Sequence, residues 1–160
     1  MKIALIPILP HKAAVFTPRL VVFNETFAPL VKKGSRGDGK KPLAVLWHEA
    51  VAGKDAEDVA AAFWYFLQQN RDKKRIVIYA DNCSAQQKSW LFVTVLITYL
   101  QHASNATEKI IVKYLETGHT AMSADSIHQV IQKKLAKSNT ACNFQDFATL
   151  TQDSRVTVKT

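Results

Sequence analysis

The chain has 160 residues, 48% of them hydrophobic and 21% charged, with five glycines and five prolines. This composition excludes disordered, collagen-like and low-complexity proteins, and the length suits one domain with a sizeable core. The two cysteines, Cys83 and Cys142, are too few for a disulfide framework or a four-thiolate zinc site. We therefore expect an intracellular protein with reduced thiols.

The net charge of +8, from 21 Lys and Arg against 13 Asp and Glu, favours a polyanionic partner such as nucleic acid. Each basic cluster alone is typical of a solvated loop or helix face, so the argument rests on the total excess. No apolar run reaches the roughly 20 residues that cross a membrane, and we expect no membrane partner. The clusters are Lys32, Lys33, Arg36, Lys40 and Lys41; Arg71, Lys73, Lys74 and Arg75; and Lys133, Lys134 and Lys137.

The first third of the chain predicts three strands. Residues 2–9 are apolar throughout, residues 19–27 are rich in β-branched and aromatic types, and residues 43–51 form a third apolar run. The connections between them are short enough to predict an antiparallel meander.

Helical periodicity begins after the meander. Asp55 and Asp58 indicate an N-cap and an acidic first turn, and apolar residues then recur at helical spacing to about Gln69. The unbroken apolar run at residues 75–80 follows. Such a run between two helices is typical of a central parallel strand.

The second half of the chain predicts two more helices and a strand. Ser84 and Gln87 form a capping-box pair, which predicts a helix over about 85–102. This helix is apolar nearly all round, so we expect it to be buried. Residues 109–116 predict a strand, and residues 123–137 predict an amphipathic helix.

The tail predicts a short helix at 144–150 and an edge strand at 155–159. The order β-β-β-α-β-α-β-α predicts an α/β protein with a mixed five-stranded sheet and helices on both faces, an order found in the ribonuclease H-like fold. The chain shows no repeat and no dividing linker. We therefore expect a single domain over residues 1–160, with its core at 2–137 and an extension at 138–160.

The first candidate site residue is Asp81, at the end of the predicted parallel strand. Ligands of open α/β sheets gather beyond the carboxyl ends of such strands. A half-exposed carboxylate at this position suits a hard divalent cation. The alternative is that Asp81 only caps the next helix.

A second polar cluster begins at Gly118 and His119 and continues into the helix predicted from residue 123. Asp125, His128 and Gln132 share one strip of that helix, beside its apolar stripe. We expect them at the margin of the core, facing a cleft. The alternatives are helix capping for Asp125 and an ordinary surface or core-edge position for His128.

Together these clusters suggest metal-dependent phosphoryl transfer. Asp81 and Asp125 could share Mg²⁺ or Mn²⁺, and two such ions hold the attacking and leaving oxygens of the reaction. His119 or His128 could move a proton or position a phosphate, because imidazole titrates near neutral pH.

The stretches LWHEAVAGKDAEDVA, IVIYADNCSAQQKSW and YLETGHTAMSADSIHQVIQKK resemble a family of uncharacterised domains in eukaryotic transposon-derived proteins. The family pattern reads W-x-E-x-x-x-G, then S-D-N-C-x-x-Q-x-K, then G-H-T-x-M-x-x-D-x-x-H, and the resemblance covers about residues 3–150. It implies a nuclear, ribonuclease H-like transposase core that acts on DNA. The matching positions are Trp47, Glu49 and Gly53; Asp81, Asn82, Cys83, Gln86 and Lys88; and Gly118, His119, Thr120, Met122, Asp125 and His128.

The resemblance implies roles for these residues. Asp81 and Asp125 are expected to ligate Mg²⁺ or Mn²⁺, and His119 and His128 to act as acid–base or phosphate-positioning groups. Full-length relatives would carry a DNA-binding module before such a core, so we expect this chain to be the core alone. Self-association stays open. Contacts to DNA or RNA are expected from Asn82, Gln86 and Lys88 and from Lys32, Lys33, Arg36, Lys40 and Lys41.

One departure from the family pattern bears on catalysis. Such cores carry a first catalytic Asp in the first strand, and the aligned position here is Ala4, with no acidic residue before Glu25. The metal site would lose a shared ligand, and with it much of its charge stabilisation. Ala80 and Ala121 also stand where the family usually has Ser and His.

Two functions stay open on these grounds. The first is a transposase-derived domain whose metal-dependent nuclease or strand-transfer chemistry is impaired at Ala4. The second is a non-catalytic, domesticated module that binds nucleic acid or protein. A small-molecule α/β enzyme is disfavoured, because the chain has neither a glycine-rich phosphate loop nor a nucleophile elbow.

Overall fold

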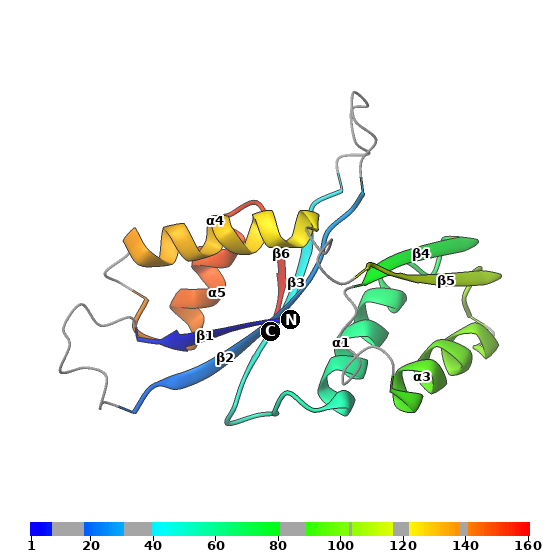
Figure 1. Ribbon diagram of the computed structural model, residues 1–160, viewed down its shortest axis with the longest axis horizontal. Helices are drawn as coiled ribbons and strands as arrows, with labels where there is room; N and C mark the ends of the chain where they lie inside the picture. Colours follow the sequence, from blue (N-terminus) through cyan, green and yellow to red (C-terminus); the bar gives the residue numbers. More distant parts are fainter. Residues whose placement is uncertain (8–17, 31–39, 81–88, 103, 117–121, 138–140) are drawn as a thin grey trace. The chain divides into compact units, whose positions relative to one another are not determined.

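The computed structural model describes residues 1–7, 18–30, 40–80, 89–102, 104–116, 122–137 and 141–160. These residues form two compact units. Unit 1 comprises Met1–Gly53 and Met122–Thr160, and unit 2 comprises Lys54–Ala121. Each unit contains both strands and helices (Figure 1), so the predicted α/β class is confirmed.

Unit 1 is built on a four-stranded sheet of order β1-β2-β3-β6. The first three strands pair antiparallel, which confirms the predicted meander, and the last pairs parallel to β3. The sheet is therefore mixed, and its tail strand lies at an edge, as the sequence predicted. The strands are β1 Lys2–Ile6, β2 Leu20–Phe27, β3 Leu43–His48 and β6 Thr157–Lys159.

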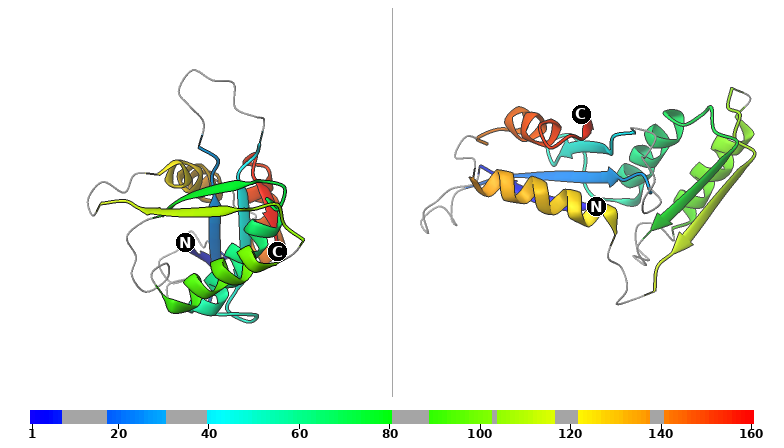
Figure 2. Two further views of the ribbon diagram at one scale, coloured as in Figure 1. Left: turned by 90° about the vertical axis from the view of Figure 1, so that its right-hand side faces the viewer. Right: turned by 90° about the horizontal axis from the view of Figure 1, so that it is seen from above.

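Two helices pack on one face of this sheet. Helix α4 spans Ser123–Lys137 and helix α5 spans Phe144–Gln152, close to both predictions. Figure 2 shows α4 along β1 and β2, and α5 beside β3 and β6. At the start of α5 the Asn143 side chain accepts a hydrogen bond from the Asp146 N–H at 2.9 Å, which fixes the helix N-terminus.

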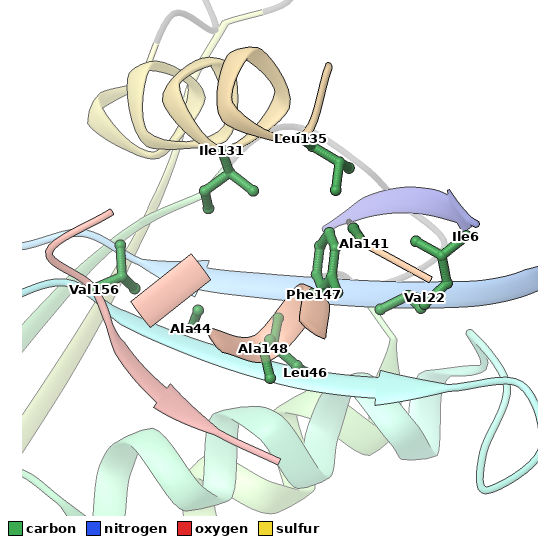
Figure 3. Packing of buried hydrophobic residues seen from close by; sticks show 10 residues of the cluster. All are labelled: Ile6, Val22, Ala44, Leu46, Ile131, Leu135, Ala141, Phe147, Ala148 and Val156. Atoms are coloured by element: carbon green, nitrogen blue, oxygen red, sulfur yellow. The ribbon is translucent and has the colours of Figure 1, made fainter. Parts of the chain in front are cut away.

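The core of unit 1 follows from the alternation of side chains along the strands. Register pairs Ala4 with Val22 and Asn24 with Leu46, and paired residues point to the same face. The apolar members of that face meet the apolar stripes of α4 and α5 in one cluster (Figure 3). Its buried residues are Ile6, Val22, Ala44, Leu46, Ile131, Leu135, Ala141, Phe147, Ala148 and Val156.

Unit 2 contains two parallel strands and two helices. Strand β4 (Arg75–Ala80) pairs with β5 (Lys109–Tyr114). Helix α1 (Ala56–Gln68) begins at the predicted cap, where the Asp55 N–H donates to Asp58 Oδ2 at 3.1 Å. Helix α3 (Trp90–Gln101) completes the unit.

Aromatic side chains join α1 to α3. The rings of Phe63 and Phe92 meet edge to face with centroids 4.8 Å apart, and Trp64 packs edge to face on Tyr99 at 5.9 Å. The Tyr99 hydroxyl is fully buried and donates to the Leu67 carbonyl at 2.9 Å. Helix α3 is therefore buried along one side only, at Phe92 and Tyr99.

Helix α3 differs from its prediction in two ways. It begins later than residue 85, because Ser89 has extended backbone and its hydroxyl accepts the Phe92 N–H, so Ser89 is the N-cap. It is also not fully buried: Trp90 is 80% exposed and Ile97 46% exposed. One helix and a two-stranded sheet cannot cover so many apolar residues. The Ser84–Gln87 capping box lies outside the described residues.

The predicted single sheet of five strands stays a prediction. Among the described residues, β4 and β5 pair with each other and the other four strands form their own sheet. The expectation that β4 is parallel is confirmed by its register with β5.

Candidate functional site

The structure describes only some of the residues singled out by sequence. Asp125 and His128 lie on α4, and the side chains of Lys40 and Lys41 are exposed before β3. The others lie outside the described residues: Asp81, Asn82, Gln86, Lys88, His119, Lys32, Lys33 and Arg36. The described part of the candidate site therefore lies in unit 1, around Asp125 and His128.

His128 lies inside unit 1 and not on its surface. Its side chain is 7% exposed, and its Nε2 lies 2.9 Å from Thr26 Oγ1 on β2. The Thr26 hydroxyl is in turn 2.8 Å from Asn24 Oδ1. Two consecutive hydrogen bonds therefore connect His128 on α4 to Thr26 and Asn24 in the sheet.

This environment changes the charge state of His128. Burial lowers the pKa of His128 from its ordinary 6.5 to about 4, and the positive charges of the Met1 amino group and Lys2 act in the same direction. The Asp125 carboxylate opposes them with a smaller effect. His128 is therefore neutral at neutral pH and forms its hydrogen bond to Thr26 as an uncharged imidazole.

Asp125 occupies the first turn of α4. Its Oδ2 accepts the Met122 N–H at 2.9 Å, and its own N–H donates to the Met122 carbonyl at 2.9 Å. This is the capping role that the sequence left open. Capping uses one carboxylate oxygen, and the described residues give Oδ1 no hydrogen bond. Its role as a metal ligand stays a prediction.

A small pocket in unit 1 brings two of the sequence motifs together. It is lined by Ala4 from β1, Asn24 from β2, and His128 and Gln132 from α4, with Lys2 at the strand start. His128 and Gln132 therefore both line this pocket, whereas Asp125, the third residue of the predicted strip, is not among its lining residues. Ala4 is the position where the resemblance leads us to expect a first carboxylate.

Sequence reasoning missed two residues of this arrangement, Asn24 and Thr26. Both are more than nine-tenths buried, and they alternate on β2 with the same face toward α4. The signal was present as two polar residues at a spacing of two within an apolar strand. A buried polar pair on one face requires a partner, which here is His128.

The first sequence motif, Trp47, Glu49 and Gly53, makes structural contacts. The indole Nε1–H of Trp47 donates to the Gly53 carbonyl at 2.6 Å. Glu49 extends the pairing of β2 and β3, since its N–H donates to the Val21 carbonyl at 3.0 Å and its Oε1 accepts the Val21 N–H at 2.9 Å. Trp47, Glu49 and Gly53 therefore close the end of the hairpin.

The basic clusters differ in whether their lysines form ion pairs with carboxylates. All described residues from Arg71 to Arg75 are exposed, but Lys73 pairs with Asp72 at 2.7 Å and Lys74 with Glu108 at 3.5 Å. On α4, Lys134 donates to the Asp153 carbonyl at 2.6 Å. Lys73 and Lys74 are therefore exposed and paired with carboxylates, and Lys134 is half-buried.

Within the described residues, no three or more His, Cys, Asp or Glu side chains gather into a metal-binding group. Among those same residues, none of the helices has the length and apolar character to cross a membrane. Cys142 is a free, exposed thiol.

The fold and site define an α/β protein with a mixed sheet. A family model described as a domain of unknown function (DUF7869) matches residues 51–159, about two thirds of the chain, so the protein belongs to this family. The match includes the second and third sequence motifs and leaves out β1, where Ala4 lies. No curated protein and no solved structure matches the chain.

Proposed function

We propose that this chain is a transposase-derived domain of ribonuclease H-like fold. It descends from a two-metal-ion core for DNA cleavage and strand transfer, and its chemistry is impaired because Ala4 replaces a catalytic Asp. The proposal includes a five-stranded mixed sheet, DNA as the partner and a nuclear location.

The observation that carries this proposal is that Ala4 and His128 line the same pocket. One comes from the first strand and the other from the last sequence motif, the two regions from which the resemblance leads us to expect parts of one metal site. A carboxylate introduced at Ala4 would face the same opening as His128. None of the described residues that line the pocket is a carboxylate, so the proposal needs this added ligand together with Asp81 and Asp125.

The residues that the proposal assigns as ligands would suit a hard cation. Carboxylate oxygens are the ligands that Mg²⁺ and Mn²⁺ prefer, and the proposal assigns Asp81 and Asp125 to this role. When bound, the ions supply charge stabilisation and a nucleophilic hydroxide. The chain's own residues supply position: Met122 orients Asp125, and Thr26 holds the neutral imidazole of His128.

The test is calorimetric titration of Mn²⁺ into the protein and into its Ala4→Asp variant. We expect the substitution to tighten binding at least about tenfold, because a third carboxylate adds a charged oxygen ligand. Adding Asp81→Asn to that variant should reverse the gain.

The matched control is Ala4→Asn, which adds a side chain of the same size without the charge. If Ala4→Asn and Ala4→Asp bind Mn²⁺ equally, the proposed metal site is wrong. Circular dichroism of each variant establishes that β1 still folds. Nicking of supercoiled plasmid by Ala4→Asp then tests whether the restored site also cleaves DNA.

A second function, a non-catalytic binding module, is favoured by the partners of the two described site residues. His128 is bonded to Thr26 and Asp125 caps its helix, so both have structural uses that need no metal. Backbone binding requires only clustered cations and weakens steeply with salt. Absence of Mn²⁺ binding in Ala4→Asp, with nucleic-acid binding intact, would favour this second function.

A further inference from the structure

One face of the two-stranded sheet in unit 2 is open within the described part of the chain. Helices α1 and α3 lie on the opposite side (Figure 1), where Ile76, Ile78 and Ala80 are buried. The alternate residues of β4 point away from these helices. Val77 is 39% exposed and Tyr79 is 42% exposed.

The parallel register sets three pairs of residues across this open face. A cationic pair stands at one end, an aliphatic pair in the middle, and a tyrosine beside a lysine at the other end. No carboxylate interrupts the array. The pairs are Arg75 with Lys109, Val77 with Ile111, and Tyr79 with Lys113.

A contact between a cation and an aromatic ring lies at the tyrosine end of this face. The Lys113 ammonium lies 5.3 Å from the Tyr79 ring centroid and 3.4 Å from its hydroxyl. At the other end, neither Arg75 nor Lys109 forms an ion pair with any residue that the structure describes. The two ends are about 13 Å apart, given the rise of a strand.

We propose that this open face binds single-stranded nucleic acid. A base stacks on the exposed ring of Tyr79, the adjacent phosphate lies at Lys113, and the backbone continues to Arg75 and Lys109. Stacking on exposed aromatics and cation tracks along the backbone are the two devices of such binding. Duplex DNA fits less well, because its bases are not free to stack. The proposal does not depend on the proposed metal chemistry.

The test is fluorescence anisotropy of a labelled oligothymidylate in EDTA, so that a failed metal site cannot affect the result. Tyr79→Thr should weaken binding roughly tenfold, the scale of one lost base stack. Tyr79→Phe should bind like the unaltered protein, because it keeps the ring. An abasic oligomer of the same length should bind Tyr79→Thr and the unaltered protein equally, since it offers no base.

The cations are tested by a charge-matched pair of variants. Lys109→Gln with Lys113→Gln and Lys133→Gln with Lys137→Gln both remove two exposed lysines four residues apart. The first pair should weaken binding more and lower the salt slope by about 1.4, at roughly 0.7 per phosphate contact. Equal losses in both pairs would overturn the proposal, as would a Tyr79→Thr defect of the same size on the abasic oligomer. Unchanged binding in Tyr79→Thr, or no binding by the unaltered protein, would also overturn it.

Discussion

The Thr26 hydroxyl lies between two buried side chains, 2.9 Å from His128 Nε2 and 2.8 Å from Asn24 Oδ1. A hydroxyl carries one hydrogen, and it is donated to the Asn24 carbonyl oxygen. Thr26 must therefore accept from His128, which places the imidazole hydrogen on Nε2. The pairing selects one neutral tautomer of His128 and links β2 to α4.

This link predicts a large cost for an isosteric substitution at Thr26. Thr26→Val keeps the shape but leaves the His128 Nε2–H and Asn24 Oδ1 buried without this partner. Unfolding free energy should fall by about 1–3 kcal/mol, measured by urea denaturation at neutral pH. Thr149→Val is the control, because Thr149 is exposed on α5 and bonds only to its own helix. Equal effects of the two substitutions would contradict the structural role of the link.

The lowered pKa of His128 predicts how stability depends on pH. The folded state has a pKa of about 4 and the unfolded state about 6.5, so between these values the unfolded chain binds more protons. Stability from this group is present above pH 6.5 and is lost as pH falls toward 4. The loss has an upper bound of about 3.5 kcal/mol, at roughly 1.4 kcal/mol for each pKa unit.

The measurement is unfolding free energy against pH for the protein and for His128→Gln. The difference between the two curves should change across this window and stay flat above it. His102→Gln, at an exposed histidine of unit 2, is the comparison variant. A flat difference between pH 4 and 6.5 for His128→Gln would show that His128 does not titrate as the structure implies.

Local signals in the sequence were enough to predict most of the elements. The Asp55–Asp58 pair marked the start of α1, the unbroken run at residues 75–80 matched β4, and the spacing after residue 123 matched α4. Each depends on contacts within a few residues. Such contacts are encoded by the segment itself.

The rest depends on which segments meet, and periodicity does not encode that. Ser84 and Ser89 both carry a capping hydroxyl, and only the structure places the N-cap of α3 at Ser89. The burial of α3 was overestimated because apolar composition does not reveal how much surface the partners can cover. The partnership of Thr26 with His128 joins residues far apart in the chain, and no local pattern pairs them.

Asp125 allows capping and metal binding to be separated. Asp125→Asn keeps an oxygen for the Met122 N–H, so unfolding free energy should change by less than about 0.5 kcal/mol, whereas Asp125→Ala should cost about 1 kcal/mol. In the Ala4→Asp background, Asp125→Asn should weaken Mn²⁺ binding at least about tenfold, because the charge is lost. Calorimetry measures this loss.

Asp146 supplies the matched control for this prediction. It caps α5 in the same way, with its Oδ2 accepting N–H groups of Cys142 and Asn143 at 3.0 and 3.2 Å. Asp146→Asn should leave Mn²⁺ binding unchanged. If both substitutions weaken it equally, Asp125 is a cap and not a ligand.

The expectation of a single domain predicts that both compact units unfold in one transition. Tyr99→Phe removes the buried hydrogen bond to Leu67 in unit 2, at a cost of about 1–2 kcal/mol. In one cooperative domain, this substitution should speed hydrogen exchange in unit 1 as well, and Thr26→Val should do the same in unit 2. Hydrogen exchange read by mass spectrometry locates each effect. Tyr79→Phe, a tyrosine exposed at the surface of unit 2, is the matched control and should change neither unit. Faster exchange confined to unit 2 in Tyr99→Phe would mean that the units fold separately, because a shared transition transmits the loss to every protected amide.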